Sequence, residues 1–200
     1  MSTDSEIFAA ARESPAAFAQ LYDRHAPAVF RYVARRLDRH AAEDIASETF
    51  LVAFEKRHSF DLTFDRALPW LLGIATNLIH KRTRLEARAW RGMLASYEAG
   101  AVSVDQFEQL GARIDAERLA GVAIHAVRRM NVGDRDVLLL YAWGDLTYEE
   151  ISIALRIPVG TVRSRLHRAR KSLRAALNRE STPSKEEENG RAHTHPQPAI

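Results

Sequence analysis

The 200-residue sequence contains no cysteine, and this absence excludes several kinds of site. Disulfide bonds, zinc sites built from thiolates and thiol redox sensors all need cysteine sulfur. No P-loop, glycine-rich dinucleotide motif or Ser/His/Asp set stands out either. We therefore expect no cofactor, no metal and no small-molecule substrate, and we predict that the chain is not an enzyme.

Long apolar runs are also missing. No stretch of 18 consecutive apolar residues occurs, and the first residues lack the pattern of a signal peptide. The apolar content of 46% is still enough to form a packed core. We expect a cytoplasmic protein of one or two small domains that does not insert into a membrane.

Strand patterns are nearly absent as well, and apolar residues recur at helical spacing through most of the chain. The spacing predicts helices over these ranges: 6–12, 16–37, 41–57, 67–88, 115–130, 133–143, 147–155 and 160–178. Pro27 should start a new helix or kink the second of them. The sequence thus predicts an all-α fold with two helical domains and two further segments: domains at 1–91 and 113–179, a flexible linker at 92–112, and a disordered tail at 180–200.

The most informative segment covers residues 147–177. A T-x-x-E capping box begins at Thr147, and an apolar helical pattern follows it. Pro158 and Gly160 interrupt that pattern, after which a second helix begins. Every formally charged side chain between residues 161 and 179 is basic. Two helices with a tight turn, the second with a basic face, are typical of a helix-turn-helix that binds a DNA groove.

A basic amphipathic helix can also lie on a membrane or bind a partner helix. Here the apolar face is narrow, because alanines alternate with single leucines along it. A narrow face suits packing against another helix better than entry into lipid. A solvated basic face without a ligand is the simplest alternative, and the segment favours DNA binding.

The predicted helix at 41–57 has an unusual polar face. Asp44, Glu48, Leu51 and Glu55 are spaced so that they share one side of the helix. The opposite side has apolar residues that can supply a core: Ile45, Ala46, Phe50, Ala53 and Phe54. A leucine surrounded by carboxylates is typical of a docking face for a basic partner. An ordinary solvated face with one exposed leucine explains the spacing equally well.

Aromatic and basic residues meet in the region that follows. Phe60, Phe64 and Asp65 lie in a predicted loop at 59–66, and Trp70 stands at the start of the next helix. One side of that helix is polar and basic, with Asn77, Lys81, Arg84 and Arg88. Such combinations bind single-stranded nucleic acid, because bases stack on rings while cations hold phosphates. The competing interpretation places the three aromatic residues in the core, and composition favours this for at least two of them.

These segments together resemble a known family. Three of them are similar to the group IV, or extracytoplasmic-function, sigma factors of bacterial RNA polymerase: EDIASETFLVAFEKR, ALPWLLGIATNLIHKRTR and the final helix-turn-helix. The resemblance covers about residues 18–91 and 118–177. It implies a sigma factor that binds core RNA polymerase and promoter DNA and directs transcription initiation. An anti-sigma factor is a further partner that the resemblance implies.

The resemblance also implies roles for individual residues. The segment that docks on a coiled coil of the largest polymerase subunit matches Asp44, Ile45, Glu48, Leu51 and Glu55. The part that opens the −10 promoter element and holds a flipped base matches Phe60, Phe64, Asp65, Trp70, Asn77, Lys81 and Arg84. The helix that contacts the −35 element matches Thr161, Arg163, Ser164, Arg165, His167, Arg168, Arg170 and Lys171. In that helix we expect Arg165, Arg170 and Lys171 at phosphates and the others nearer bases.

Two other functions stay open. A stand-alone helix-turn-helix regulator that binds DNA as a dimer would explain the second domain, but not the acidic stripe or the aromatic and basic residues of the first. Glu55 and His58 form an E-x-x-H step of the kind found in di-iron bundles, but no second step occurs. His193 and His195 lie in the predicted tail, where two histidines are usually incidental. Tight binding to a palindromic duplex without polymerase would favour the regulator.

Overall fold

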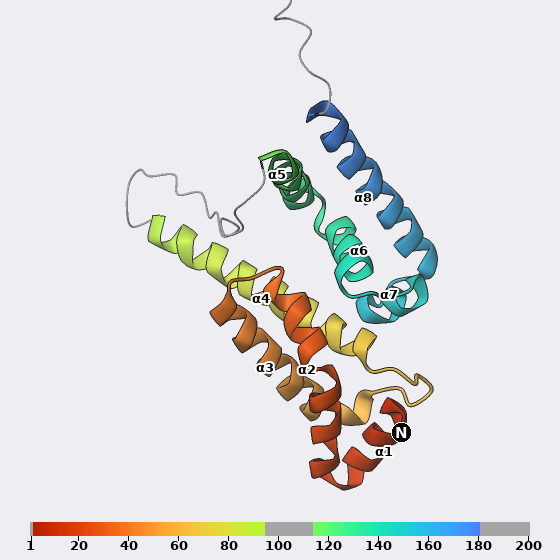
Figure 1. Ribbon diagram of the computed structural model, residues 1–200. Helices are drawn as coiled ribbons and strands as arrows, with labels where there is room; N and C mark the ends of the chain where they lie inside the picture. Colours follow the sequence, from red (N-terminus) through yellow and green to blue (C-terminus); the bar gives the residue numbers. More distant parts are fainter. Residues whose placement is uncertain (1, 95–113, 181–200) are drawn as a thin grey trace, which may run out of the picture.

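The computed structural model describes residues 2–94 and 114–180, and the regular elements in these two ranges are all helices (Figure 1). The first range forms α1 (Asp4–Glu13), α2 (Ala19–Ala34), α3 (Arg39–Glu55) and α4 (Leu68–Leu94), with short 3-10 helices at Pro15–Phe18 and Arg57–Ser59. The second range forms α5 (Ile114–Arg129), α6 (Val132–Trp143), α7 (Tyr148–Leu155) and α8 (Val159–Glu180). Most of the predicted linker and tail falls outside the described residues.

The helices begin where side chains satisfy free backbone N–H groups. Thr147 and Glu150 form the predicted capping box at the start of α7. Thr3 makes an equivalent box with Glu6 at the start of α1, which the sequence analysis did not identify. Pro27 lies inside α2, and the helix runs through it as a single element, so this proline does not begin a new helix.

The turn of the helix-turn-helix differs from the expectation in one detail. The residue with left-handed backbone is Arg156, with a φ of 53°, and it caps the end of α7. Helix α8 then starts at Val159, so Gly160 lies inside its first turn rather than in the connection. The connection between the helices is therefore shorter than the sequence predicted, because the second helix was expected to begin at residue 160.

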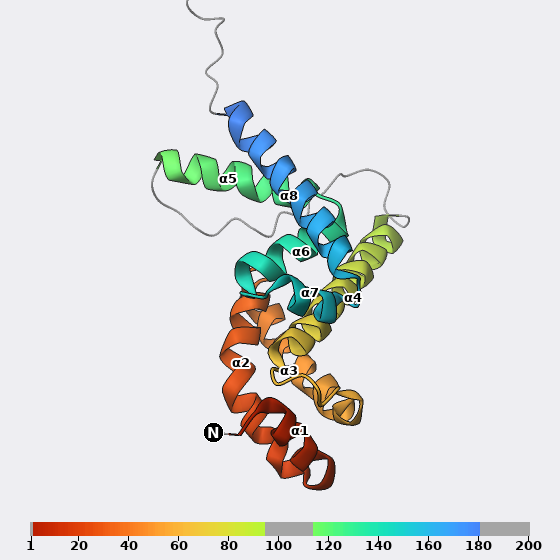
Figure 2. The ribbon, with the colours of Figure 1, turned by 90° about the vertical axis from the view of Figure 1, so that its right-hand side faces the viewer.

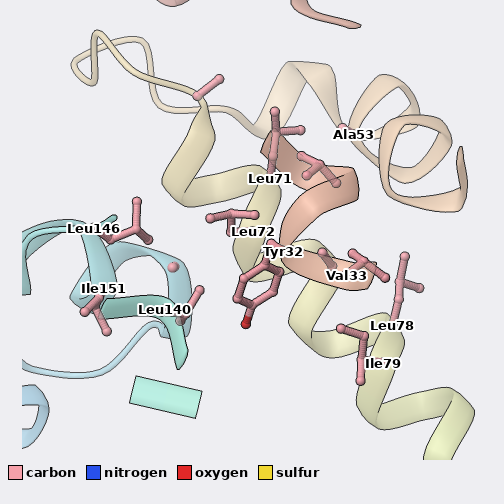
Figure 3. Packing of buried hydrophobic residues seen from close by; sticks show 14 of the residues in the cluster. Tyr32, Val33, Ala53, Leu71, Leu72, Leu78, Ile79, Leu140, Leu146 and Ile151 are labelled. Carbon is pink, nitrogen blue, oxygen red and sulfur yellow. The ribbon is translucent and has the colours of Figure 1, made fainter. Parts of the chain in front are cut away.

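In the N-terminal unit, defined here as α1 to α4, α2 and α3 pack on α4, and α1 packs against α2 and the two 3-10 helices. Helices α2 and α3 both contact α4, and the core between them is apolar (Figure 3). Leu71, Leu78 and Ile79 of α4 are buried against residues such as Val33 of α2 and Ala53 of α3. The predicted inner face of α3 is confirmed, because its apolar side supplies this core.

The C-terminal unit, defined as α5 to α8, is built on α8. Helices α5, α6 and α7 all contact α8, which crosses the unit as its longest element (Figure 2). Val162, Leu166 and Ala169 are buried along the inner side of α8, as the spacing predicted. The basic side of α8 therefore faces away from the core of the unit.

The two units pack directly against each other, through α4 of the first and α7 of the second (Figures 1 and 2). Leu72 points toward Leu140 and Leu146 across the boundary (Figure 3). Gly73 allows a close approach of the two helices, because a Cβ atom there would lie 2.3 Å from the carbonyl oxygen of Ala154. A pattern of two domains on a linker does not predict this contact.

Candidate polymerase and DNA interfaces

Helix α3 presents the predicted acidic stripe on its outer side. Leu51 is 57% exposed, and Asp44 and Glu55 are exposed on the same helix. Glu48 is half-buried, and its carboxylate lies 3.8 Å from the Nζ of Lys81 on α4. The stripe therefore offers an apolar side chain among carboxylates, which is the arrangement that a docking face requires.

Ile45, which the resemblance assigns to polymerase binding, does not belong to this outer face. Its side chain is 3% exposed and packs in the core. The reason is geometric, because residue 45 lies about 100° around the helix from residue 44 and turns inward. We therefore revise Ile45 from a contact residue to a core residue that supports the stripe.

A tyrosine that has no predicted binding role lies near the same helix. Tyr22 of α2 is exposed, and its ring packs edge-on against Phe50 with 4.9 Å between the ring centroids. Phe50 is next to Leu51 in the sequence and is buried. Helical spacing alone predicts Tyr22 in the core, and only its exposure in the structure identifies it as a possible contact residue.

The loop between α3 and α4 divides its aromatic residues between core and surface. Phe60 is 3% exposed, and its ring stacks on that of Phe8 with 4.1 Å between the ring centroids. Trp70 is half-buried, and its ring meets both phenylalanines edge-on at 5.4 and 5.5 Å. Phe60 therefore has no exposed surface for DNA in this structure, which corrects its assignment as a contact residue.

The tip of the loop, residues 61–66, is exposed throughout. Phe64 is 37% exposed, and Leu62, which the sequence analysis missed, is exposed beside it. Asp61 accepts hydrogen bonds from the backbone N–H and the hydroxyl of Thr63, at 3.0 and 2.8 Å, and these bonds lower the pKa of Asp61. The tip thus presents a ring on a hydrogen-bonded turn, which suits stacking on an unpaired base.

The polar side of α4 is exposed at Asn77, Lys81 and Arg84, as predicted. This side lies next to the acidic stripe of α3, since Nη1 of Arg82 is 3.8 Å from the carboxylate of Asp44. Pairs at this distance attract only weakly where water screens them. A phosphate could therefore compete for the α4 cations without disturbing the fold.

A groove of about 730 Å³ lies alongside α8 in the C-terminal unit. Its lining is basic and aromatic: Tyr148, Arg163, Leu166, His167, Arg170, Lys171 and Arg174. Among the predicted −35 residues, Arg163, Ser164, His167, Arg168 and Lys171 are exposed. Thr161 is half-buried, and its carbonyl oxygen accepts the Ser164 hydroxyl at 3.0 Å. The exposed cations of α8 form a positive surface that suits a DNA backbone.

Three of the predicted −35 arginines contact residues of their own unit. Arg168 makes two hydrogen bonds to Asp134, at 2.8 and 3.1 Å, and these bonds raise the pKa of Arg168. The guanidinium of Arg170 lies over the ring of Tyr141, 4.8 Å from its centroid. Arg165 is half-buried against α6. A contact between Arg168 and a base would have to replace the pair with Asp134.

A buried polar cluster, which no motif predicted, lies where the two units meet. Asp136 of α6 accepts a hydrogen bond from Arg36 of α2 at 2.9 Å and lies 3.0 Å from Nε2 of His80 on α4. Arg36 also donates to the hydroxyl of Tyr32, which is hydrogen-bonded to Thr76. Burial would raise the pKa of Asp136, but the bond with His80 and the charge of Arg36 outweigh burial and lower it. The cluster ties α2 and α4 to α6.

Family comparisons match both units. Residues 21–89 match the model described as Sigma-70 region 2, and residues 122–173 match the model described as Sigma-70, region 4. The chain is 31% identical over 169 residues to the ECF RNA polymerase sigma factor SigW of Bacillus subtilis, covering 80% of this chain and 89% of SigW. It is 29% identical over 174 residues to the ECF sigma factor SigL of Mycobacterium tuberculosis, covering 86% and 96%.

Two solved structures have a similar fold. CnrH, solved in complex with the cytosolic domain of CnrY, has a TM-score of 0.61 and 23% identity, and the match covers 88% of this chain and 98% of CnrH. The sigma factor RpoE of Bartonella quintana, solved with the anti-sigma factor NepR, has a TM-score of 0.58 and 22% identity, covering 80% and 96%. These likenesses support the all-α fold of two helical domains.

None of the helices in residues 2–94 and 114–180 is long and apolar enough to span a membrane. The sigma factor family, which the sequence resembles, is confirmed by both family models and by the relatives named above. The chain belongs to the extracytoplasmic-function sigma factors, and it binds core RNA polymerase and promoter DNA to direct transcription initiation.

Proposed function

We propose that the two units divide promoter recognition between them. Residues 1–91 dock on core RNA polymerase and open the −10 element, and residues 113–179 contact the −35 element, with residues 92–112 linking the two and residues 180–200 outside both. The protein acts through binding alone, without catalysis of its own. It works in the cytoplasm, where polymerase and chromosome meet.

The observation that supports this proposal most directly is the outer face of α3. Leu51 projects between exposed carboxylates while its neighbours Ile45 and Phe50 are buried. A partner with an apolar pocket and a basic rim would bury Leu51 and pair with Asp44, Glu48 and Glu55. Most of the binding free energy of such interfaces comes from a few central residues, so Leu51 is the residue to change.

The −10 element is opened at the loop tip and the adjacent side of α4. Phe64 and Asp65 of the tip receive an unpaired base, while Asn77, Lys81 and Arg84 hold the strand that leads to it. Taking a base out of the duplex costs a few kcal/mol, and stacking on a ring returns about 1–3 kcal/mol per base. Trp70 supports the loop from its half-buried position at the start of α4.

The −35 element is bound along the groove beside α8. Arg163, His167 and Lys171 lie at this groove and are exposed, so they make the first contacts with the duplex. Arg170 and Arg165 are restrained by their own unit and serve phosphates or the fold. The regulator alternative is less well supported, because residues 21–89 match a sigma region that a helix-turn-helix regulator does not need.

We also propose that an anti-sigma factor holds this chain inactive. RpoE, which has a similar fold, was solved with the anti-sigma factor NepR. Leu51 and Tyr22 on the N-terminal unit and the groove along α8 are exposed surfaces that such a partner could cover. A protein that competes with core polymerase for the purified chain would support this role.

The docking assignment is tested with Leu51→Arg in a pull-down on purified core RNA polymerase. Leu85→Arg is a matched control, because Leu85 of α4 is 53% exposed and lies outside the acidic stripe. We expect Leu51→Arg to abolish retention by the polymerase and Leu85→Arg to leave it unchanged. Equal retention of both variants would show that α3 does not dock through Leu51.

A further inference from the structure

Helix α1 precedes the segment that matches Sigma-70 region 2, and it packs against the segment that leads into the loop tip. Its contacts with residues 57–67 involve a ring stack, two arginines and one buried carboxylate. They lie on both sides of the exposed tip, residues 61–66. None of the promoter-binding surfaces assigned above includes α1, so its contacts with this loop have no role yet in the proposed function.

The first contact fixes the chain just before the tip. Phe8 of α1 is fully buried, and its ring stacks on Phe60 while meeting Trp70 edge-on. The same helix thus joins the last residue before the tip to the first turn of α4. Stacked and edge-on ring pairs of this kind favour one relative orientation of the rings.

The second contact holds the backbone around the same point. Arg12 donates from Nη2 to the carbonyl oxygens of His58, at 3.2 Å, and Phe60, at 2.8 Å. In return, Arg57 donates from Nε to the carbonyl oxygen of Ala11 at 3.0 Å. These bonds span more than 45 residues of sequence, so they set the path of the loop rather than its local turn.

The third contact fixes the end of the tip and Ala67, the residue after it. Asp4 is 3% exposed, and its Oδ2 accepts the backbone N–H of Ala67 at 2.7 Å. The backbone N–H of Asp4 donates to the carbonyl oxygen of Asp65 at 3.3 Å. His25 and Arg24 of α2 hold the carboxylate in place, at 2.7 and 2.5 Å. The capping box of Thr3 fixes the first turn of α1, where Asp4 lies.

We propose that α1 is a positioning element for the −10 loop, in which Asp4, Phe8 and Arg12 hold residues 57–67 so that the exposed tip keeps the shape that receives an unpaired base. The proposal rests on the assignment of this loop to the −10 element given above. Its physical basis is preorganisation: a loop already ordered by the fold loses less conformational entropy when it binds the strand.

The contacts through which Asp4, Phe8 and Arg12 hold residues 57–67 are tested by hydrogen exchange of the free protein, in wild type, Asp4→Asn and Glu13→Gln. Glu13→Gln is the matched control, because it makes the same chemical change at an exposed carboxylate of the same helix. In Asp4→Asn we expect exchange of amides in residues 57–67, Ala67 foremost, to rise about tenfold or more while α8 is unchanged. Wild-type exchange rates in Asp4→Asn would show that Asp4 does not hold residues 57–67.

The positioning role is tested with core polymerase on a promoter that the wild-type protein selects from a library. We expect Asp4→Asn to keep its affinity for core polymerase and to lose about tenfold in discrimination between the selected −10 sequence and one with a changed base. If core affinity and discrimination fall together, α1 is only structural and the proposal fails. If the wild type itself shows no −10 preference, the assignment of the loop to the −10 element fails. The exchange measurement then still decides whether α1 holds residues 57–67.

Phe8→Leu provides a second variant if Asp4→Asn does not fold. Leucine keeps an apolar side chain in the core, smaller than phenylalanine, but removes the ring that stacks on Phe60. We expect the same pattern: faster exchange in residues 57–67 and weaker −10 discrimination, with core binding retained. Unchanged exchange and discrimination in Phe8→Leu would contradict the proposal as directly as they would in Asp4→Asn.

Discussion

The base of the −10 loop and the boundary between the two units are built with the same chemistry, a buried aspartate held by one arginine and one histidine. Asp4 is held by Arg24 and His25 inside the N-terminal unit. Asp136 is held by Arg36 and His80 across the boundary. The two clusters differ in what surrounds them, and that difference determines what each can do.

Helix α1, which carries Asp4, is also held by its ring contacts, because Phe8 stacks on Phe60 and Trp70 meets both rings edge-on, and these contacts would keep α1 in place if the carboxylate were lost. Around Asp136 the two units meet through leucines and the backbone contact at Gly73, with an ion pair between Arg66 and Glu150 and a contact of Arg35 with the Trp143 ring. We therefore expect a change at Asp4 to loosen a loop and a change at Asp136 to separate the units. The predictions below test this contrast.

Asp136→Ala should have the largest effect. It leaves the guanidinium of Arg36, whose side chain is 6% exposed, buried without its carboxylate. Breaking a buried pair in this way costs about 3–5 kcal/mol, and here the cost falls on the contact between the units. We expect small-angle X-ray scattering to show a larger radius of gyration while the helical circular dichroism signal persists. An unchanged radius would mean that the other contacts, the Arg66–Glu150 ion pair among them, hold the units together without Asp136.

Glu43→Ala is the control for Asp136→Ala. Glu43 forms an exposed pair with Arg39 one helical turn away, at 3.1 Å. Such pairs contribute about 0.3–0.5 kcal/mol. The radius of gyration should therefore match that of the wild type, and any expansion would mean that the scattering change does not report on the buried cluster.

Gly73→Ala tests the apolar part of the same boundary. The new methyl group would lie 2.3 Å from the carbonyl oxygen of Ala154, so α4 and α7 have to move apart. Overpacking of this kind costs about 1–3 kcal/mol. We expect a lower midpoint of thermal unfolding, measured by circular dichroism, and a partial increase in the radius of gyration.

Gly121→Ala is matched to Gly73→Ala, because a Cβ atom at Gly121 meets nothing within 4 Å. Alanine in the interior of α5 should stabilise that helix by up to about 1 kcal/mol. The two glycine variants should therefore shift the unfolding midpoint in opposite directions. Shifts of the same sign would contradict the close contact at Gly73.

Acid should weaken the cluster of Asp4, Arg24 and His25 at the base of the −10 loop. Burial alone would raise the pKa of Asp4, but hydrogen bonds from His25 and Ala67, the charge of His25 and the bond from Arg24 outweigh burial and lower it to about 2. A lowered pKa means that the stabilisation is complete above pH 3.8 and is lost as the pH falls toward 2. The loss amounts to about 2 kcal/mol. In Asp4→Asn, the fall in unfolding free energy between pH 4 and pH 2 should be smaller by about this amount.

Arg168→Ala should have the smallest effect on the fold, because the Arg168 side chain is 57% exposed and water screens its charge, although Asp134 is only 13% exposed. We expect an unchanged midpoint of thermal unfolding. If Arg168 contacts a base, binding to the −35 element should weaken by about 1–3 kcal/mol with lost preference at one position, measured by fluorescence anisotropy. Uniformly weaker binding on all sequences would assign Arg168 to a phosphate instead.

The helices and the basic side of α8 could be predicted from the sequence because their signals are local. The capping box at Thr147 and the apolar spacing of Val162 and Leu166 lie within a few turns of one another, and the structure confirms both. The acidic stripe around Leu51 is equally local. Spacing within a single helix fixes which side chains share a face, whatever the rest of the chain does.

The two aspartate clusters could not be predicted, because their partners are far apart in the sequence. Arg36 and Asp136 are separated by 100 residues, and Asp4 and Ala67 by 63. Such pairs leave no periodic trace in one sequence. The same limit explains Phe60, whose burial depends on Phe8 more than 50 residues away rather than on the loop that contains it.

The most direct test of the division between the units compares two variants on one promoter with core polymerase. One is Phe64→Ala at the loop tip, and the other replaces Arg163, His167 and Lys171 of α8 by alanine. Permanganate footprinting reports opening of the −10 element, and nuclease protection reports occupancy of the −35 element. We predict that Phe64→Ala loses opening while upstream protection persists, and that the α8 variant loses upstream protection. Equal loss of both signals in both variants would contradict the division.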